Sequence, residues 1–118
     1  MKLHELAYFT DNVQGMTDFY RGLLGTNPVA QSDDMAIFMT GRTKIFIHRN
    51  YPTSKGELPA SNHIAFAVDD VDAACVALTE QGLTVDIHPR DYYWGRSAYL
   101  LDPDGHQVEI IKGTESAK

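Results

Sequence analysis

Two histidines and one glutamate stand in strand-like segments of the chain and could together bind a metal ion. Glu109 lies within residues 107–111, where it alternates with the apolar side chains of Val108 and Ile110. A lone carboxylate is costly to bury without a hydrogen bond, a partner charge or a metal ion. His4 and His63 each stand near the start of an apolar, strand-like run. Two imidazoles and one carboxylate form a three-ligand set for a divalent first-row metal, with water or substrate at the open positions.

The spacing of the two histidines is repeated in the residues that follow them. His4 and His63 are 59 positions apart (63 − 4), and so are Asp11 and Asp70 (70 − 11). Each aspartate precedes a run of apolar side chains at helical spacing. An internal repeat of this length indicates two supersecondary units, each with the order β-α-β-β-β, whose open sheets complete each other.

Periodicity and Gly and Pro signals predict the elements of the two units. In the first unit we expect a strand over residues 3–10, a helix that begins after Asp11 or Asn12 and ends at Gly25, and short strands over 29–31, 35–40 and 44–49. In the second unit we expect a strand over 63–68, a helix that begins after Asp69 or Asp70 and ends at Gly82, and strands over 83–87, 97–101 and 107–111.

Length and composition predict one globular domain over residues 1–118. Module one covers about residues 1–50 and module two about residues 62–113. Residues 51–61, which lack periodicity, are expected to link them. The expected fold class is α+β, with the two modules pairing into a cupped mixed β-sheet around a central cavity.

The charge and composition exclude several classes of protein. The net charge is −6 and the pI is near 5.2, with Lys and Arg scattered along the chain. This argues against a surface for nucleic acid or for an anionic membrane, because either requires a basic patch. Cys75 is the single cysteine, so an intrachain disulfide is impossible. No signal peptide or membrane-spanning run is recognisable, and we expect a reduced, cytoplasmic location.

Alternation within the strands predicts which side chains face the cavity. In the second unit Ile64, Phe66 and Val68 are expected to pack on the helix, which leaves His63, Ala65 and Ala67 facing the cavity together with Glu109. By the 59-residue repeat, His4, Leu6 and Tyr8 face the cavity from the first strand. The same repeat places Glu5 on the face toward the helix, opposite Ile64.

Residues 89–96 are expected to form a loop at the rim of this cavity. Tyr92, Tyr93 and Trp94 are consecutive aromatic residues that would stack on a planar or apolar ligand, and Arg90 or Arg96 would hold an anionic group. Alternatively, the three rings would close the cavity mouth or fill a dimer seam by simple packing.

Several motifs together resemble the vicinal oxygen chelate superfamily, which includes glyoxalase I, methylmalonyl-CoA epimerase, fosfomycin-resistance proteins, extradiol dioxygenases and bleomycin-resistance proteins. The motifs are His4 through Asp11 followed by Phe19-Tyr20 and Leu24-Gly25, His63 through Asp70, Trp94-Gly95-Arg96, and Asp102 through His106 with Glu109. They run across nearly the whole chain.

The resemblance implies that metal ligands come from the first and last strand of each unit. Carried over, it marks His4, His63 and Glu109 as ligands of a divalent ion such as Fe, Mn, Ni, Zn or Co. The fourth family position falls on Phe46 in one register and on Ile45 in another, and neither side chain binds a metal. The four-ligand set of glyoxalase I is therefore incomplete. In the first register Phe46 and His48 share a face, and both are candidate substrate contacts.

The resemblance further implies a metal-dependent enzyme that chelates a small substrate through adjacent oxygens. Glu109 would also move a proton, as a metal-associated carboxylate does in the glyoxalase and epimerase branches. An isomerase or lyase and a dioxygenase share this ligand set, and thiol transfer to an epoxide antibiotic ranks lower because only Arg90 and Arg96 suggest a cationic pocket.

Two other readings stay open at this point. One is a metal-free binding protein, like the bleomycin-resistance branch, that sequesters an aromatic or cationic small molecule. The other is a domain whose own side chains fill the cavity and whose role is assembly. A homodimer is expected by resemblance in either case.

Overall fold

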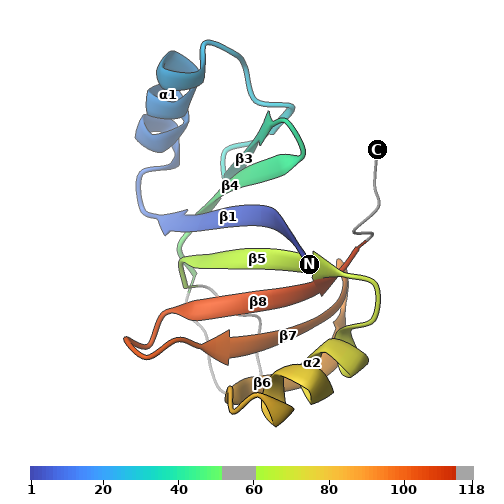
Figure 1. The fold of residues 1–118 in the computed structure, drawn as a ribbon. Helices are drawn as coiled ribbons and strands as arrows, with labels where there is room; N and C mark the ends of the chain where they lie inside the picture. The colour runs from blue at the N-terminus through green and yellow to red at the C-terminus, as the bar shows by residue number, and fades with distance from the viewer. Residues whose placement is uncertain (52–60, 114–118) are drawn as a thin grey trace. The chain divides into compact units, whose positions relative to one another are not determined.

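The computed structural model describes residues 1–51 and 61–113 of the chain (Figure 1). The elements of these residues are β1 (Lys2–Thr10), α1 (Val13–Leu24), β2 (Ala30–Gln31), β3 (Met35–Thr40), β4 (Thr43–Arg49), β5 (His63–Val68), α2 (Val71–Glu80), β6 (Val85–Tyr92), β7 (Gly95–Leu101) and β8 (Gln107–Lys112). The order β-α-β-β-β occurs twice, which confirms the predicted α+β class and the repeat of two modules. The predicted linker at 51–61 lies mostly outside the described residues.

The chain forms two compact units that correspond to the two modules. One unit comprises residues 5–62 and the other comprises residues 1–4 with residues 63–118. The boundary falls within β1, so the first residues of this strand count with the second module.

The first module packs α1 against strands in the order β2-β3-β4-β1, with β1 parallel to β4 and the other neighbours antiparallel. The helix begins after Asn12, whose side-chain oxygen accepts a hydrogen bond from the amide of Gly15 at 2.9 Å. It ends at Gly25, which adopts the left-handed conformation that glycine tolerates. The buried core consists of Val13, Ala36, Phe38, Ile45 and Ile47, with Tyr8, Met16, Tyr20 and Leu24 packed against it.

The second module packs α2 against strands in the order β5-β8-β7-β6, with β5 parallel to β8 and the other neighbours antiparallel. Asp70 caps the helix by accepting a hydrogen bond from the amide of Ala73 at 3.0 Å. Its buried core is Val68, Val71, Cys75, Ala98, Leu100 and Ile110, with Phe66, Ala74, Leu78, Val85 and Val108 packed against it. This core leaves His63, Ala65, Ala67 and Glu109 on the face of the sheet away from α2, as predicted.

The prediction that His4, Leu6 and Tyr8 of β1 face the cavity is wrong. Tyr8 pairs with Ile47 of β4 and packs in the core beneath α1, with its ring 6.2 Å from that of Tyr20. Even-numbered side chains of β1 therefore face the helix, and His4 shares their side by alternation. Glu5, Ala7 and Phe9 lie on the opposite face of the sheet.

A one-residue error in the repeat explains this correction. The two helices begin after Asn12 and Asp70, so structurally equivalent positions are 58 residues apart (70 − 12), not 59. Because side chains alternate with a period of two, a shift of one residue exchanges the faces of the whole strand. Glu5, and not His4, is therefore the equivalent of His63 (63 − 58).

The predicted rim loop at residues 89–96 is also wrong for most of its length. β6 continues through Tyr92, and only Tyr93 and Trp94 form the turn before β7. Pro89 lacks an amide hydrogen, yet β6 tolerates it because β6 ends the strand order and its register against β7 shifts between Ile87 and Arg90.

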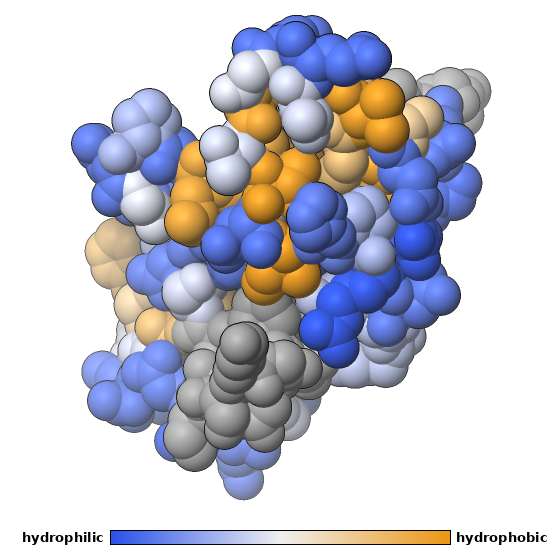
Figure 2. Space-filling model, turned by 90° about the horizontal axis from the view of Figure 1, so that it is seen from below, coloured by the Kyte–Doolittle hydropathy of each residue, from blue (hydrophilic) through white to orange (hydrophobic). Residues whose placement is uncertain are grey.

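The surface combines hydrophilic and apolar side chains. Figure 2 shows orange, apolar atoms reaching the surface between blue, hydrophilic ones. Large exposed apolar side chains include Phe19 and Leu23 of α1 and Val76 of α2, each at least 60% exposed. In the described part of the chain, no helix is long and apolar enough to cross a membrane.

Candidate functional site

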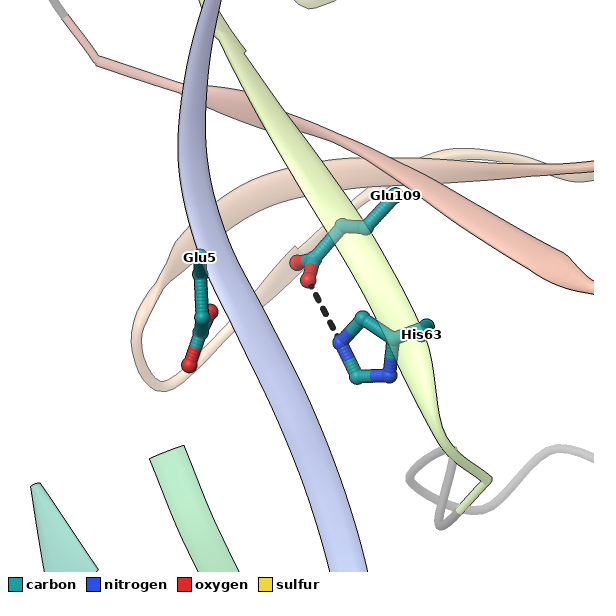
Figure 3. Close-up of side chains that lie close together, drawn as sticks. All are labelled: Glu5, His63 and Glu109. Carbon is teal, nitrogen blue, oxygen red and sulfur yellow. Dashed lines mark hydrogen bonds and ion pairs between the residues drawn. The ribbon is translucent and has the colours of Figure 1, made fainter. Parts of the chain in front are cut away.

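The second module brings His63 and Glu109 together. β5 and β8 are parallel neighbours in which Ala65 pairs with Glu109, so His63, two residues earlier, projects from the same face. The imidazole Nε2 lies 3.0 Å from the carboxylate Oε1, and the two side chains are only 7% and 3% exposed. Figure 3 shows the two groups turned toward each other. The two side chains thus share a face of the sheet, as the alternation predicts.

The second carboxylate oxygen of Glu109 is held from β7. The Ser97 hydroxyl donates a hydrogen bond to Oε2 at 2.7 Å, and the indole Nε1 of Trp94 donates to the Ser97 oxygen at 3.1 Å. Ser97 is completely buried and Glu109 is 2% exposed. Ser97 was not among the predicted site residues, because only the pairing of β7 with β8 brings it to Glu109.

Glu109 is held in its ionised form. Burial by itself raises the pKa of this carboxyl, but hydrogen bonds from His63 and Ser97 and the attraction of His63 outweigh it. A further hydrogen bond from Tyr99, its cross-strand partner, acts in the same direction. The net result is a pKa below the ordinary value for glutamate. Glu109 is thus a buried, oriented carboxylate that is charged at neutral pH.

Aromatic side chains surround this carboxylate. The Tyr99 ring meets His63 edge-on at 5.9 Å, and the Tyr92 ring lies 6.1 Å from Tyr99 and is stacked on Trp94 at 4.4 Å. The hydroxyl of Tyr92 is buried and has no hydrogen-bond partner among the described residues. Burial raises the pKa of Tyr92, Arg90 lowers it and Glu109 raises it again, with a net increase. The hydroxyl therefore stays protonated and can donate to a ligand.

Arg96 and Tyr93, two of the predicted substrate contacts, lie at exposed or already paired positions and not beside the Glu109 carboxylate. The Arg96 guanidinium forms ion pairs with Asp72 at 2.7 Å and with Asp91 at 3.0 Å, so two carboxylates already balance its charge. Tyr93 is 86% exposed and meets Trp94 edge-on at 4.9 Å. Arg90 is placed differently, with its guanidinium carbon 5.0 Å from the centre of the Tyr92 ring.

The first module carries an aromatic cluster on the face away from α1. It consists of Phe9, Phe46, His48 and Tyr51, with neighbouring ring centres 5.5 to 6.4 Å apart. The Nδ1 of His48 bonds the carbonyl oxygen of Arg49 at 2.8 Å, so Nδ1 carries the proton and Nε2 keeps its lone pair when the ring is neutral. Phe46 and His48 thus share a face, as predicted.

Pairing within each module identifies the equivalent positions. Ala7 pairs with Phe46 in the first module, and Ala65 pairs with Glu109 in the second. Ala7 and Ala65 are 58 residues apart (65 − 7), so Phe46 is the counterpart of Glu109. Of the two registers left open by the sequence, the one with Phe46 is therefore the structural one. The first module thus offers Glu5 at the first-strand position, and Figure 3 draws this side chain projecting from β1.

Comparison with known proteins places the chain in a family. Residues 2–110 match the family described as the Glyoxalase/Bleomycin resistance protein/Dioxygenase superfamily. The chain belongs to this superfamily. The predicted resemblance to vicinal oxygen chelate proteins is confirmed.

The glyoxalase superfamily members most similar to the chain include two curated proteins. The fosfomycin resistance protein FosX of Mesorhizobium japonicum is 31% identical over 120 residues, covering 95% of this chain and 86% of that protein. The metallothiol transferase FosB of Staphylococcus epidermidis is 26% identical over 116 residues, covering 95% of this chain and 84% of that protein.

A solved structure supports the same glyoxalase-type fold. Methylmalonyl-CoA epimerase of Streptomyces coelicolor, in complex with 2-nitronate-propionyl-CoA, matches with a TM-score of 0.63 at 18% identity, covering 97% of this chain and 98% of that one. At this identity the likeness concerns the fold alone.

The residues of the second module fit a divalent metal ion. An imidazole nitrogen and a carboxylate oxygen are both favoured ligands of divalent first-row metals. Here both are buried, they converge, and the carboxylate stays ionised. The hydrogen bond from Ser97 also supplies the outer-shell partner that metal-binding carboxylates usually have.

Proposed function

We propose that this protein is a divalent-metal-dependent enzyme of the glyoxalase type, acting on a small substrate that presents two adjacent oxygens. The observation that carries the proposal is the convergence of His63 and Glu109 as a buried pair, 3.0 Å apart, with an ionised carboxylate. A buried structural carboxylate needs only hydrogen bonds, whereas this one meets an imidazole, a group whose nitrogen can bind a metal ion.

Within this proposal His63 and Glu109 hold the ion, and Glu5 is the candidate third ligand by its place in the repeat. Glu5 is included because it occupies in the first module the position that His63 occupies in the second, on the face away from the helix. The sequence predicted His4 in this role, and the corrected faces of β1 favour Glu5. The third ligand would then be a carboxylate and not a second imidazole. Oxygen-rich ligand sets favour harder ions such as Mn or Fe.

The side chains around the ion would divide the remaining tasks. When bound, the metal would polarise the substrate oxygens and stabilise the charge that develops on them. Glu109 is the candidate group for moving a proton, because it is ionised and oriented. The hydroxyl of Tyr92, which has no hydrogen-bond partner within residues 1–51 and 61–113, would donate a hydrogen bond to a substrate oxygen, and the stacked rings of Tyr92 and Trp94 would exclude water.

The names of the relatives define the first reactions to test. FosB is named a metallothiol transferase and FosX a fosfomycin resistance protein. Thiol transfer and reaction with fosfomycin are therefore tested beside isomerisation and epimerisation. Arg96 is paired with Asp72 and Asp91, so Arg90 beside Tyr92 is the better candidate for contacting an anionic substrate.

The experiment measures metal content and turnover in the same preparations. Untagged protein is analysed by inductively coupled plasma mass spectrometry, then loaded with Mn, Fe, Ni, Co or Zn and assayed against fosfomycin with thiols, methylglyoxal hemithioacetal, methylmalonyl-CoA and catechols. We expect about one ion per chain and turnover of one substrate class, both lost in Glu109→Gln. Failure of the wild-type protein to bind any of these ions would overturn the proposal.

A second candidate function is metal-free binding of an aromatic or cationic molecule. The aromatic cluster of Phe9, Phe46, His48 and Tyr51 favours it, because aromatic faces attract flat and cationic ligands. Calorimetric titration with bleomycin distinguishes the two functions. Binding that survives Glu109→Gln and is lost in Phe46→Ala would support sequestration. The homodimer and the cytoplasmic location stay predictions, and the former is checked by sedimentation velocity.

A further inference from the structure

We propose that Ser97, held by Trp94, is a positioning residue that orients the Glu109 carboxylate for metal binding. The inference rests on the proposed metal site and assigns a role to two residues that would not contact the ion. It concerns a chain of two hydrogen bonds that runs from Trp94 through Ser97 to Glu109.

The direction of this chain is chemically determined. An indole nitrogen only donates, so the Ser97 oxygen must accept from Trp94. An ionised carboxylate only accepts, so the single Ser97 proton must point to Oε2 of Glu109, 2.7 Å away. Each hydrogen bond thus fixes the next, and the hydroxyl of Ser97 has one orientation available to it.

Packing holds both ends of the chain in place. The Trp94 ring is stacked on Tyr92 at 4.4 Å with an angle of 3° between the planes, and it packs against the buried cluster of Ala65, Ala67 and Ile111. Ser97 is 0% exposed, so water does not compete for its proton. The indole therefore keeps its orientation without help from a ligand.

This arrangement leaves one carboxylate oxygen for the metal. Oε2 is engaged by Ser97, whereas Oε1 faces Nε2 of His63 at 3.0 Å. Without Ser97 the carboxylate loses one of the hydrogen bonds that limit rotation about its last bond, and binding would have to restrict the added freedom. Outer-shell partners of metal ligands typically contribute about 10–100-fold to metal affinity.

The chain also makes Trp94 a reporter of the site. Trp94 is the single tryptophan of the sequence, so protein fluorescence excited at the indole band comes from this ring alone. A change at Glu109 reaches the indole through one intervening hydroxyl. Zn²⁺ is a suitable probe because its filled d shell excludes redox chemistry.

The experiment titrates Zn²⁺ into wild type, Ser97→Ala and Trp94→Phe, by calorimetry for all three and by tryptophan fluorescence for the first two. Thr17→Val is the matched control, since Thr17 is also 0% exposed and donates its hydroxyl to the carbonyl of Val13 at 2.7 Å, within α1. Circular dichroism establishes that each variant is folded.

We expect Zn²⁺ to bind Ser97→Ala about 10-fold or more weakly than wild type, with a smaller loss in Trp94→Phe and none in Thr17→Val. The emission of Trp94 should change on Zn²⁺ binding in wild type and stay constant in Ser97→Ala at saturating metal. A merely structural Ser97 would lower stability without changing these two readouts.

Zn²⁺ binding to wild type and to Ser97→Ala separates the positioning role of Ser97 from the metal site itself. Equal Zn²⁺ affinities of wild type and folded Ser97→Ala would overturn the role of Ser97 and leave the metal site standing. Absence of Zn²⁺ binding to wild type would overturn the metal site, and the positioning role with it.

Discussion

Nε2 of His63 and Oε1 of Glu109 lie 3.0 Å apart across two parallel strands, although the two residues are 46 positions apart in the sequence. Parallel neighbours cannot be joined by a tight turn, so α2 and two further strands must fold between them. The pair forms only when the second module is complete. Burial keeps the His63–Glu109 pair ordered. An imidazole nitrogen beside a carboxylate oxygen makes the pair a candidate metal site.

His63→Ala is expected to abolish metal binding and to lower the stability of the second module. The substitution removes one ligand and leaves the buried Glu109 carboxylate with a lost hydrogen bond, which costs about 1–3 kcal/mol. Urea unfolding and metal titration measure the two effects. His106→Ala is the control, because its ring pairs with Asp102 in an exposed turn and its side chain is 73% exposed. An unchanged metal affinity in His63→Ala would contradict the assignment.

Sequence patterns predicted the second module well because its strands alternate clearly. Phe66 and Val68 pack in the core beneath α2, and Ile64 lies on the same face by alternation. The alternation therefore predicted correctly that His63 faces away from the helix. Ser97 was missed for a physical reason. A small polar residue in an apolar strand carries no periodic signal, and only the pairing of β7 with β8 brings it to Glu109.

The first module shows how a single position decides a site. Asp11 and Asn12 are both good helix caps, and the choice of Asp11 gave the repeat of 59. The side chain of Thr10 accepts a hydrogen bond from the amide of Asn12, and Asn12 itself caps the helix. Local helix-capping propensity does not distinguish Asp11 from Asn12 as the cap. The packing of Tyr8 under α1 does, because it fixes which face of β1 meets the helix. The exchange of His4 for Glu5 follows from that packing.

Glu5→Gln is therefore expected to weaken metal binding, and His4→Gln is expected to leave it unchanged. The first substitution removes a charged ligand and keeps the shape of the side chain. The second alters the neighbouring residue in the same strand, so the two variants form a matched pair. Titration with Mn²⁺, followed by its electron paramagnetic resonance signal, measures both affinities. Weaker binding only in His4→Gln would restore the original assignment.

Phe38→Ala is expected to lower the free energy of unfolding by about 3–5 kcal/mol, because the ring is completely buried in the first module. Phe19→Ala should change it by less than about 0.5 kcal/mol, since Phe19 is 60% exposed on α1. Chemical unfolding followed by circular dichroism measures the difference. A large loss in Phe19→Ala would instead indicate that α1 is covered in solution, for example by a second copy of the chain.

The ion pair between Asp72 of α2 and Arg96 of β7 should make stability depend on pH. The hydrogen bond from Arg96 lowers the pKa of Asp72 and outweighs the opposing effect of burial. A carboxyl whose pKa is lower in the folded state stabilises the fold above its unfolded pKa, and this contribution is lost as the pH falls through the folded pKa. Asp72→Asn should therefore unfold at a lower temperature than wild type at pH 7.

The same comparison at acid pH is the control for this effect. Below the folded pKa of Asp72 the wild-type carboxyl is protonated, so the melting temperatures of wild type and Asp72→Asn should converge. Differential scanning calorimetry at a series of pH values from pH 7 downward, past the ordinary pKa of aspartate, measures whether the difference shrinks. A gap that stays constant over this range would show that Asp72 contributes through packing and not through its charge.

Tyr92→Phe is expected to stabilise the unliganded protein and to weaken substrate binding. The buried hydroxyl of Tyr92 has no partner among the described residues, and an unsatisfied buried polar group costs about 1–3 kcal/mol. Removing it should raise the free energy of unfolding by about 1 kcal/mol and leave Zn²⁺ affinity unchanged. Tyr93→Phe, at an 86% exposed position, should change neither quantity. Urea unfolding checks the sign, and destabilisation in Tyr92→Phe would show that the hydroxyl is already satisfied and is not reserved for a ligand.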